Sequence, residues 1–228
     1  MKTLKLLLVL LLAAQWAPAQ AQQTDTKPSD SSAHAQLEKG KSSFRETWVN
    51  PDADFTQYTK LYVWDGQFEY RDVGPARRSR GTMVRTHKRE FGISDADRAK
   101  FEKAISDAFM KQIEKGKRFQ LVAEIGPNTL ILRGGLLDIV SNVPPEMTGP
   151  SEIYLSSVGE ATLVMELLDA ETGEVVALVA ERRRIQPMGG QIGSTPTNSV
   201  TVLADVRRFA SSAASRLSKE LDKAIAGR

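Results

Sequence analysis

Three acidic residues are the first candidates for chemistry, because they lie in strand-like segments that can hold carboxyl groups at fixed distances. They are Asp138, Glu166 and Glu181. Hydrolysis of the glycosidase type uses two carboxyl groups held about 5–10 Å apart in a cleft. Arginines alternate with these acids along the same segments, namely Arg133, Arg182 and Arg184. Surface ion pairs between neighbouring strands therefore explain the acids more simply than a hydrolytic site does.

The sequence offers no other constellation for catalysis or metal binding. It contains no cysteine, which excludes disulfides, thiol catalysis and cysteine-ligated metals. The two histidines, His34 and His87, fall in polar segments where we expect them to be solvated. The glycine-rich run 189–195 is similar to a phosphate-binding loop but lacks the lysine that such loops direct at the phosphates. We therefore predict no catalytic residues, no metal and no cofactor.

The strongest local charge is a basic segment over residues 76–90, ARRSRGTMVRTHKRE. Its basic residues are Arg77, Arg78, Arg80, Arg85, Lys88 and Arg89. The segment has neither helical nor strand periodicity, and its glycine favours a surface loop. Guanidinium groups hold anions through bidentate, charge-assisted hydrogen bonds. These six residues are the candidate contact with an anionic partner, and a solvated loop without any partner is the alternative.

Residues 1–21 have the three parts of a cleavable secretory signal peptide. A start with two lysines precedes an unbroken apolar run over residues 6–14, and Ala19-Gln20-Ala21 matches the pattern before a cleavage site. The apolar run is far shorter than the roughly 20 residues of a membrane-spanning helix. Cleavage removes two of the 31 basic residues and none of the 28 acidic ones. A mature chain so close to neutral gives no electrostatic reason to expect nucleic acid as a partner.

The mature chain divides into a tether and one domain. Residues 22–45 are mostly Gln, Ser, Thr, Asp and Lys, which predicts a flexible tether. Residues 46–228 predict a single α/β domain that is long enough to bury its own core. We expect this mature protein to be periplasmic and, having no cysteine, to carry no lipid anchor.

Hydrophobic periodicity predicts the elements of that domain. Five strands are expected within residues 58–70, 119–123, 129–140, 160–168 and 175–183. Gly134-Gly135, inside the third of these, indicates a bulge or a close approach of two backbones. One amphipathic helix begins at the N-cap Ser94 and directs Phe101, Ile105 and Phe109 at the sheet, and a second spans about residues 202–226. The expected fold is α+β, a two-layer sandwich of a mixed sheet of about five strands with both helices on one face.

Several segments of this pattern, in this order, resemble a bacterial secreted family catalogued as domain of unknown function 3313. They are TWVNPDADFTQYTKLYV, LLDIVSNVPPE, LLDAETGEVVALVAERR and a closing helix that begins near SVTVLADVRRFA. The resemblance covers roughly residues 46–226. Members of that family are typically predicted lipoproteins, and this chain differs in having no cysteine. The family has no established activity, so the resemblance implies no catalytic residues.

We expect a non-enzymatic protein of the cell envelope that acts as an interaction or assembly accessory domain. Its expected partner is an envelope protein or an anionic envelope component. A hydrolase that uses strand carboxylates is one alternative, and two acids converging in a deep pocket with raised pKa values would favour it. A carrier of a small ligand or lipid is the other, and a large apolar cavity between the sheet and the helices would favour that.

Overall fold

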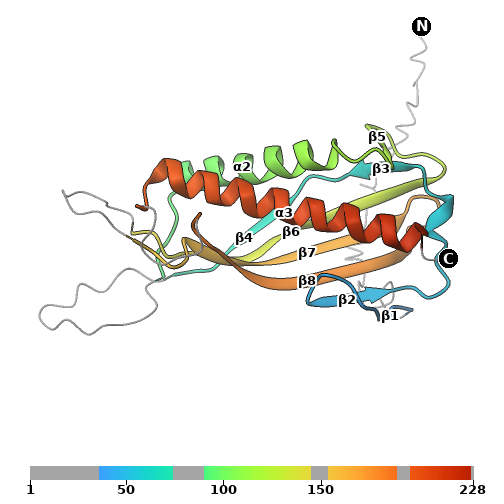
Figure 1. Cartoon of the computed structure of the whole chain (residues 1–228), viewed down its shortest axis with the longest axis horizontal. Helices are drawn as coiled ribbons and strands as arrows, with labels where there is room; N and C mark the ends of the chain where they lie inside the picture. The colour runs from blue at the N-terminus through green and yellow to red at the C-terminus, as the bar shows by residue number, and fades with distance from the viewer. Residues whose placement is uncertain (1–35, 74–89, 145–153, 189–195, 227–228) are drawn as a thin grey trace, which may run out of the picture.

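A computed structural model describes residues 36–73, 90–144, 154–188 and 196–226 of the chain. The strands are β1 (Glu38–Lys39), β2 (Glu46–Val49), β3 (Lys60–Val63), β4 (Gln67–Tyr70), β5 (Gln120–Val122), β6 (Thr129–Ser141), β7 (Gly159–Asp169) and β8 (Val175–Ile185). A 3-10 turn, η1 (Phe55–Gln57), precedes β3. The helices α2 (Asp95–Ile113) and α3 (Ser199–Ala226) lie side by side over one face of the sheet (Figure 1). The predicted α+β class is confirmed.

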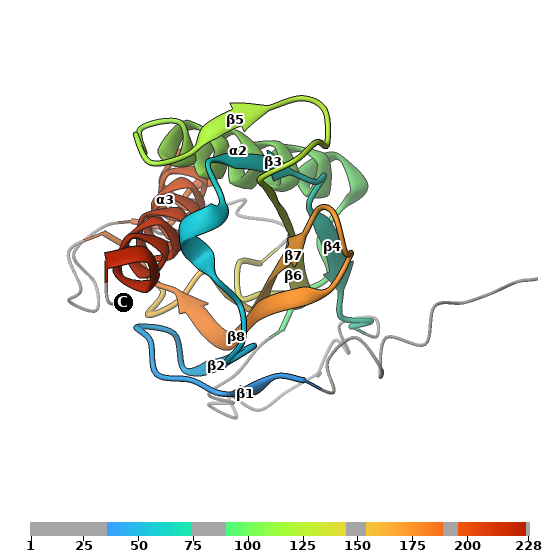
Figure 2. The same ribbon diagram turned by 90° about the vertical axis from the view of Figure 1, so that its right-hand side faces the viewer.

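The sheet has eight strands rather than about five, so the predicted strand number is wrong. Their order is β1-β2-β8-β7-β6-β3-β5, and β4 also pairs with β6. The expected strand in residues 58–70 is two strands, because Asp65-Gly66 interrupts it. Both halves run parallel to β6, with Leu61 opposite Leu130 and Phe68 opposite Leu136. In Figure 2 the sheet curves so that β3 and β5 lie beside α2 while β8 lies beneath α3.

Strands β7 and β8 form where the sequence predicted strands at residues 160–168 and 175–183, and they pair as a hairpin. From Ala161 to Leu167, every second residue of β7 is apolar and buried under the helices. At the turn, the Asp169 carboxylate accepts hydrogen bonds from the backbone N–H groups of Glu171 and Thr172, at 2.7 and 3.0 Å. Gly173 takes the left-handed conformation, with a φ of 74°, that glycine adopts without steric cost.

The ends of the helices follow from their capping residues. The Ser94 side chain accepts a hydrogen bond from the Asp97 N–H, which confirms the predicted start of α2. The last helix begins three residues earlier than predicted, at Ser199. The Asn198 side chain accepts hydrogen bonds from the N–H groups of Val200 and Thr201, each at 3.0 Å. This cap satisfies the first backbone donors and allows three polar or exposed positions to join the helix.

Residues just before position 46, where we expected the domain to start, also pack against the rest of the fold. Phe44 is buried, with 4% of its surface exposed. The Arg216 guanidinium of α3 lies 4.2 Å from the centre of the Phe44 ring. The Arg45 N–H donates to the Glu181 carboxylate on β8 at 3.2 Å. Phe44 and Arg45 therefore contact the helix and the sheet, and residues 1–35 lie outside the described ranges.

Neither helix that the structure describes combines the length and the apolar composition needed to cross a membrane.

Candidate functional site

The three strand carboxylates do not come together in a site. Side chains alternate between the two faces of a strand. Leu163 and Met165 are buried under the helices, so Glu166 points to the opposite face of the sheet. Glu181 stands opposite Leu163 in the β7–β8 pairing and therefore lies on the helix-covered face. Two of the proposed hydrolytic partners are thus separated by the thickness of the sheet.

Each carboxylate is held by arginines instead. Glu166 accepts hydrogen bonds from the neighbouring-strand residue Arg133, the shorter contact being 2.6 Å. Asp138 accepts two hydrogen bonds from Arg71, at 2.7 and 2.6 Å, and one from Arg182 at 2.6 Å. The predicted ion pairs between strands are therefore confirmed for Asp138 and Glu166.

For Glu181 the predicted surface position is wrong. Its side chain is 8% exposed, and its main partner is Arg216 from α3 rather than an arginine of a neighbouring strand. Strand alternation places Glu181 toward the core, and the helix arginine supplies the charge that a buried carboxylate needs.

The pKa shifts of Asp138 and Glu181 are opposite to the shift that a general acid needs. Hydrogen bonds from Arg71 lower the pKa of Asp138 to about 2. Burial alone would raise the pKa of Glu181, but the hydrogen bond and the charge of Arg216 outweigh burial and lower it. A general acid near neutral pH needs a raised pKa. These carboxylates are therefore structural partners of arginines.

The candidate contact residues Arg77, Arg78, Arg80, Arg85, Lys88 and Arg89 lie outside the described ranges, as do His34, His87 and the run 189–195. The residues that flank the basic segment are described. Arg71 donates to Glu90 at 2.8 Å, and its backbone N–H donates to the Ile139 carbonyl at 2.9 Å. Arg71 and Glu90, on either side of residues 74–89, thus lie beside β6. Within the described ranges, no group of three or more His, Asp or Glu side chains could hold a metal ion.

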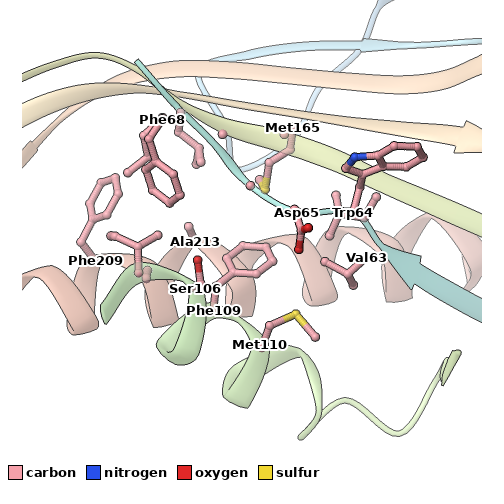
Figure 3. A pocket seen from close by; sticks show the side chains of 18 residues that line it. Val63, Trp64, Asp65, Phe68, Ser106, Phe109, Met110, Met165, Phe209 and Ala213 are labelled. Atoms are coloured by element: carbon pink, nitrogen blue, oxygen red, sulfur yellow. The ribbon is translucent and has the colours of Figure 1, made fainter. Parts of the chain in front are cut away.

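The feature that the sequence did not locate is an apolar pocket between α2, α3 and the sheet. Its volume is about 250 Å³. Figure 3 shows its walls, with Phe109 and Met110 from α2, Phe209 from α3 and Met165 from β7. Strand residues Leu132, Leu136 and Leu163 complete the lining on the side of the sheet. The pocket therefore opens into the main hydrophobic core.

Two glycines of β6 allow the strands around the pocket to approach closely. A Cβ on Gly134 would lie 2.4 Å from the carbonyl oxygen of Val164 in β7. A Cβ on Gly135 would lie 2.1 Å from the carbonyl oxygen of Gln67 in β4. The close backbone approach predicted for these glycines is confirmed. The irregularity in the pairing of β6 lies further on, between Leu137 and Val140, around Asp138 with its φ of 53°.

The opening of the pocket lies between α2 and the connection from β3 to β4. Asp65, on this connection, and Ser106, on α2, are exposed polar residues of the lining (Figure 3). The Trp64 ring points to the other side of the connection and packs edge-on against Tyr62, with ring centres 6.2 Å apart. The interruption that divides β3 from β4 thus also supplies the polar rim of the pocket.

Phe109 has a different environment from the one we predicted. Phe101 and Ile105 are buried under the sheet as expected, at 9% and 8% exposure. Phe109 is half-buried and forms a wall of the pocket. The helical period places it on the inner side of α2, but no sheet residue fills the space opposite it. Large-to-small changes at Phe109 therefore act on the pocket as well as on the core.

A second hollow, of about 310 Å³, lies near the ends of α2 and α3. Its lining mixes apolar residues such as Ile113 and Leu221 with Lys117, Arg118 and Asp222. It lacks the continuous apolar interior of the first pocket, which makes the first pocket the stronger candidate site.

Comparisons with known proteins address the fold and the family. A DUF330 family protein from Xanthomonas campestris is 15% identical at a TM-score of 0.41, over 77% of this chain and 94% of that one. A DUF4136 family protein from Bacteroides thetaiotaomicron is 13% identical at a TM-score of 0.37, over 82% and 97%. The PelC dodecamer from Paraburkholderia phytofirmans is 12% identical at a TM-score of 0.33, over 72% and 88%. At these values the likenesses carry no information about function.

No curated protein matches the sequence. The model of the family described as "Protein of unknown function (DUF3313)" matches residues 27–217, which is well over half of the chain. The resemblance found in the sequence segments is therefore confirmed, and the chain belongs to the DUF3313 family.

Proposed function

We propose that this protein binds a small apolar molecule, or one apolar chain of a lipid, in the pocket between α2, α3 and the sheet. The observation that carries the proposal is the pocket itself, a continuous apolar space of about 250 Å³ that reaches the core. A carrier was one of the functions left open by the sequence, and this cavity is the feature that favours it. The strand carboxylates favour catalysis less, because arginines hold them on both faces of the sheet.

The size and lining of the pocket suit a small ligand. An apolar cavity of about 150 Å³ is large enough to stay dry and bind benzene. Sites for drug-sized ligands begin at about 300 Å³. A pocket between these sizes fits a bicyclic aromatic molecule or a short aliphatic chain. Its lining includes three phenylalanines, one tryptophan and two methionines. Methionine is an adaptable residue that suits apolar ligands of varied shape.

The location of this activity is part of the proposal. Residues 1–21 support export through the signal peptide, and the absence of cysteine supports a periplasmic protein without a lipid anchor. A carrier of apolar molecules has a role in that compartment, because such molecules must cross an aqueous space between membranes.

A second candidate function is contact with an anionic partner through the basic segment that contains Arg77, Arg78 and Arg80. Support comes from the flanking residues, since Arg71 holds Glu90 at 2.8 Å and Asp138 at 2.6 Å. These ion pairs hold Arg71 and Glu90, on either side of residues 74–89, beside Asp138 of β6. An accessory domain that recruits an envelope partner in this way is compatible with ligand binding at the separate apolar pocket.

Titration with the neutral fluorescent probe 1-naphthol, a bicyclic aromatic molecule, tests the proposed function. We expect its emission to rise on binding to the full chain, with saturation at one probe per pocket. Ala213 lines the pocket, and an Ala213→Leu substitution places three more carbon atoms in it. We expect this variant to bind the probe at least about tenfold more weakly, because the added side chain occupies the space of the ligand.

The matched control is Ser212→Leu, which adds the same side chain at an exposed position of α3, one residue earlier. It should bind the probe as the unmodified chain does. If the probe does not bind, or if both leucine variants bind it equally well, the pocket is not a ligand site.

A further inference from the structure

We propose that the ligand of the apolar pocket is a cationic amphiphile, an aliphatic or aromatic group that ends in an amine. This inference rests on the proposed function and adds the chemical class of the ligand. It comes from the polar groups at the opening, and from what surrounds them.

The opening carries a single kind of charge. Of the eighteen residues that line the pocket, Asp65 is the one with an ionisable side chain, and Ser106 is the one with a hydroxyl group. Asp65 lies on the connection from β3 to β4, and Ser106 lies on α2 (Figure 3). Both residues are exposed, so a ligand that reaches from the apolar interior to solvent can meet the Asp65 carboxylate.

Both groups are available to a ligand. Neither the Asp65 carboxylate nor the Ser106 hydroxyl makes a side-chain hydrogen bond or an ion pair with another residue in the described ranges. The nearest charged residues on the same helix, Lys103 and Asp107, are paired with each other at 2.9 Å. The carboxylate at the opening thus has no cationic partner from α2.

The interior of the pocket fixes the orientation of such a ligand. Its deeper walls are carbon and sulfur atoms of residues such as Phe109, Met165 and Phe209. A charged group left in this interior would lose its hydration without gaining a partner, which is strongly unfavourable. The apolar end must enter first, and the charged end must remain at the opening beside Asp65. There an ammonium group can donate hydrogen bonds to the carboxylate.

The charge at the opening discriminates between amphiphiles of the same chain length. At the dielectric constant of water, an opposite unit charge about 4 Å from the charged end of the ligand strengthens binding about fivefold. A like charge at that distance weakens binding by a similar factor. An amine is therefore favoured about twentyfold over the matching carboxylate, with the neutral alcohol between them. Because Asp65 is exposed, high salt should reduce this difference.

Calorimetric titrations with octylamine, octanol and octanoate at pH 7 test the inference. The three probes share one chain and differ in the charge of one end. We expect octylamine to bind most tightly, about twentyfold more tightly than octanoate. In an Asp65→Asn variant, the amine and the carboxylate should differ by less than about threefold. The control is Glu69→Gln, the same loss of charge at an exposed position of β4 that does not line the pocket, and it should leave the order unchanged.

The outcomes separate this inference from the proposed function. If octanoate binds as tightly as octylamine, or if Asp65→Asn leaves the preference intact, the cationic class is wrong while apolar binding stands. If none of the three probes binds to the unmodified chain, both the inference and the proposed function fail.

Discussion

Replacing Gly134 with alanine tests how the two long strands pack beside the pocket. An alanine Cβ would lie 2.4 Å from the carbonyl oxygen of Val164 and 3.0 Å from the Cα of Met165. Both contacts are with the backbone of β7, in the middle of the sheet, so no flexible side chain can move aside. The two strands must separate locally, or β6 must shift away from β7.

The expected cost combines two opposing effects. Alanine gains about 0.5–1 kcal/mol over glycine inside a regular element, because the unfolded chain loses less entropy. Forcing an additional group into a close-packed site costs about 1–3 kcal/mol. We therefore expect Gly134→Ala to lower the free energy of unfolding by roughly 1–2 kcal/mol. In a domain of this size, that corresponds to a fall in the melting temperature of about 2–8 °C.

Urea unfolding followed by circular dichroism measures this change. The matched control is Gly126→Ala, since nothing lies within 4 Å of a Cβ at Gly126 and its φ is not positive. The control should be neutral or slightly more stable, by up to about 1 kcal/mol. Equal stability of the two alanine variants would show that β6 and β7 are not packed as closely as described.

Three further predictions concern the core, the ion pairs and processing. Phe109→Ala should lower the free energy of unfolding by about 1–2 kcal/mol, and Phe101→Ala by about 3–5 kcal/mol. The two losses differ because Phe109 faces a pocket whereas Phe101 is buried. Equal losses in thermal unfolding would contradict this. The pKa of Asp138 is lowered from 3.8 to about 2, so its ion pairs stabilise the fold above about pH 4 and lose this effect as the pH falls through 2. The difference in unfolding free energy between the unmodified chain and Asp138→Asn should therefore shrink between pH 6 and pH 2, and a constant difference would refute the assignment. N-terminal sequencing of the exported protein should begin at Gln22, whereas an exported product that retains Met1 would disprove cleavage.

The elements with a strong local signal were predictable from the sequence. The β7–β8 hairpin combines alternating apolar residues with a turn centred on Gly173, and α2 begins at a serine cap. In both cases the physical cause lies within a few neighbouring residues, so the sequence alone carries it. The close approach around Gly134-Gly135 was predictable for the same reason, because no other residue tolerates that contact.

The elements held by distant contacts were not predictable in this way. Strand β1 has two residues and β2 has four, and their place in the sheet depends on pairing with β8. The burial of Phe44 depends on Arg216, which lies more than 170 residues later in the chain. A polar composition around a single phenylalanine gives no sign of such a contact.

The pocket was the least predictable feature. It arises where α2, α3 and four strands leave space between them, and no single segment contains that information. Asp65-Gly66 was a visible turn signal within residues 58–70, and it would have indicated the division into β3 and β4. That division creates the opening of the pocket. Because Phe109 lines a pocket with this opening, its side chain is only half-buried.

Methyl NMR of the full chain with ¹³C-labelled methionine tests the central claim most directly. Met110 and Met165 line the pocket from two different walls, whereas Met188 is 58% exposed and lies outside it. Leucine substitutions at each position assign the three signals. On addition of octylamine, we expect the signals of Met110 and Met165 to shift together and saturate, while the signal of Met188 stays in place. Unchanged signals of Met110 and Met165 at saturating octylamine, or a shift confined to Met188, would contradict the assignment of this pocket as the ligand site.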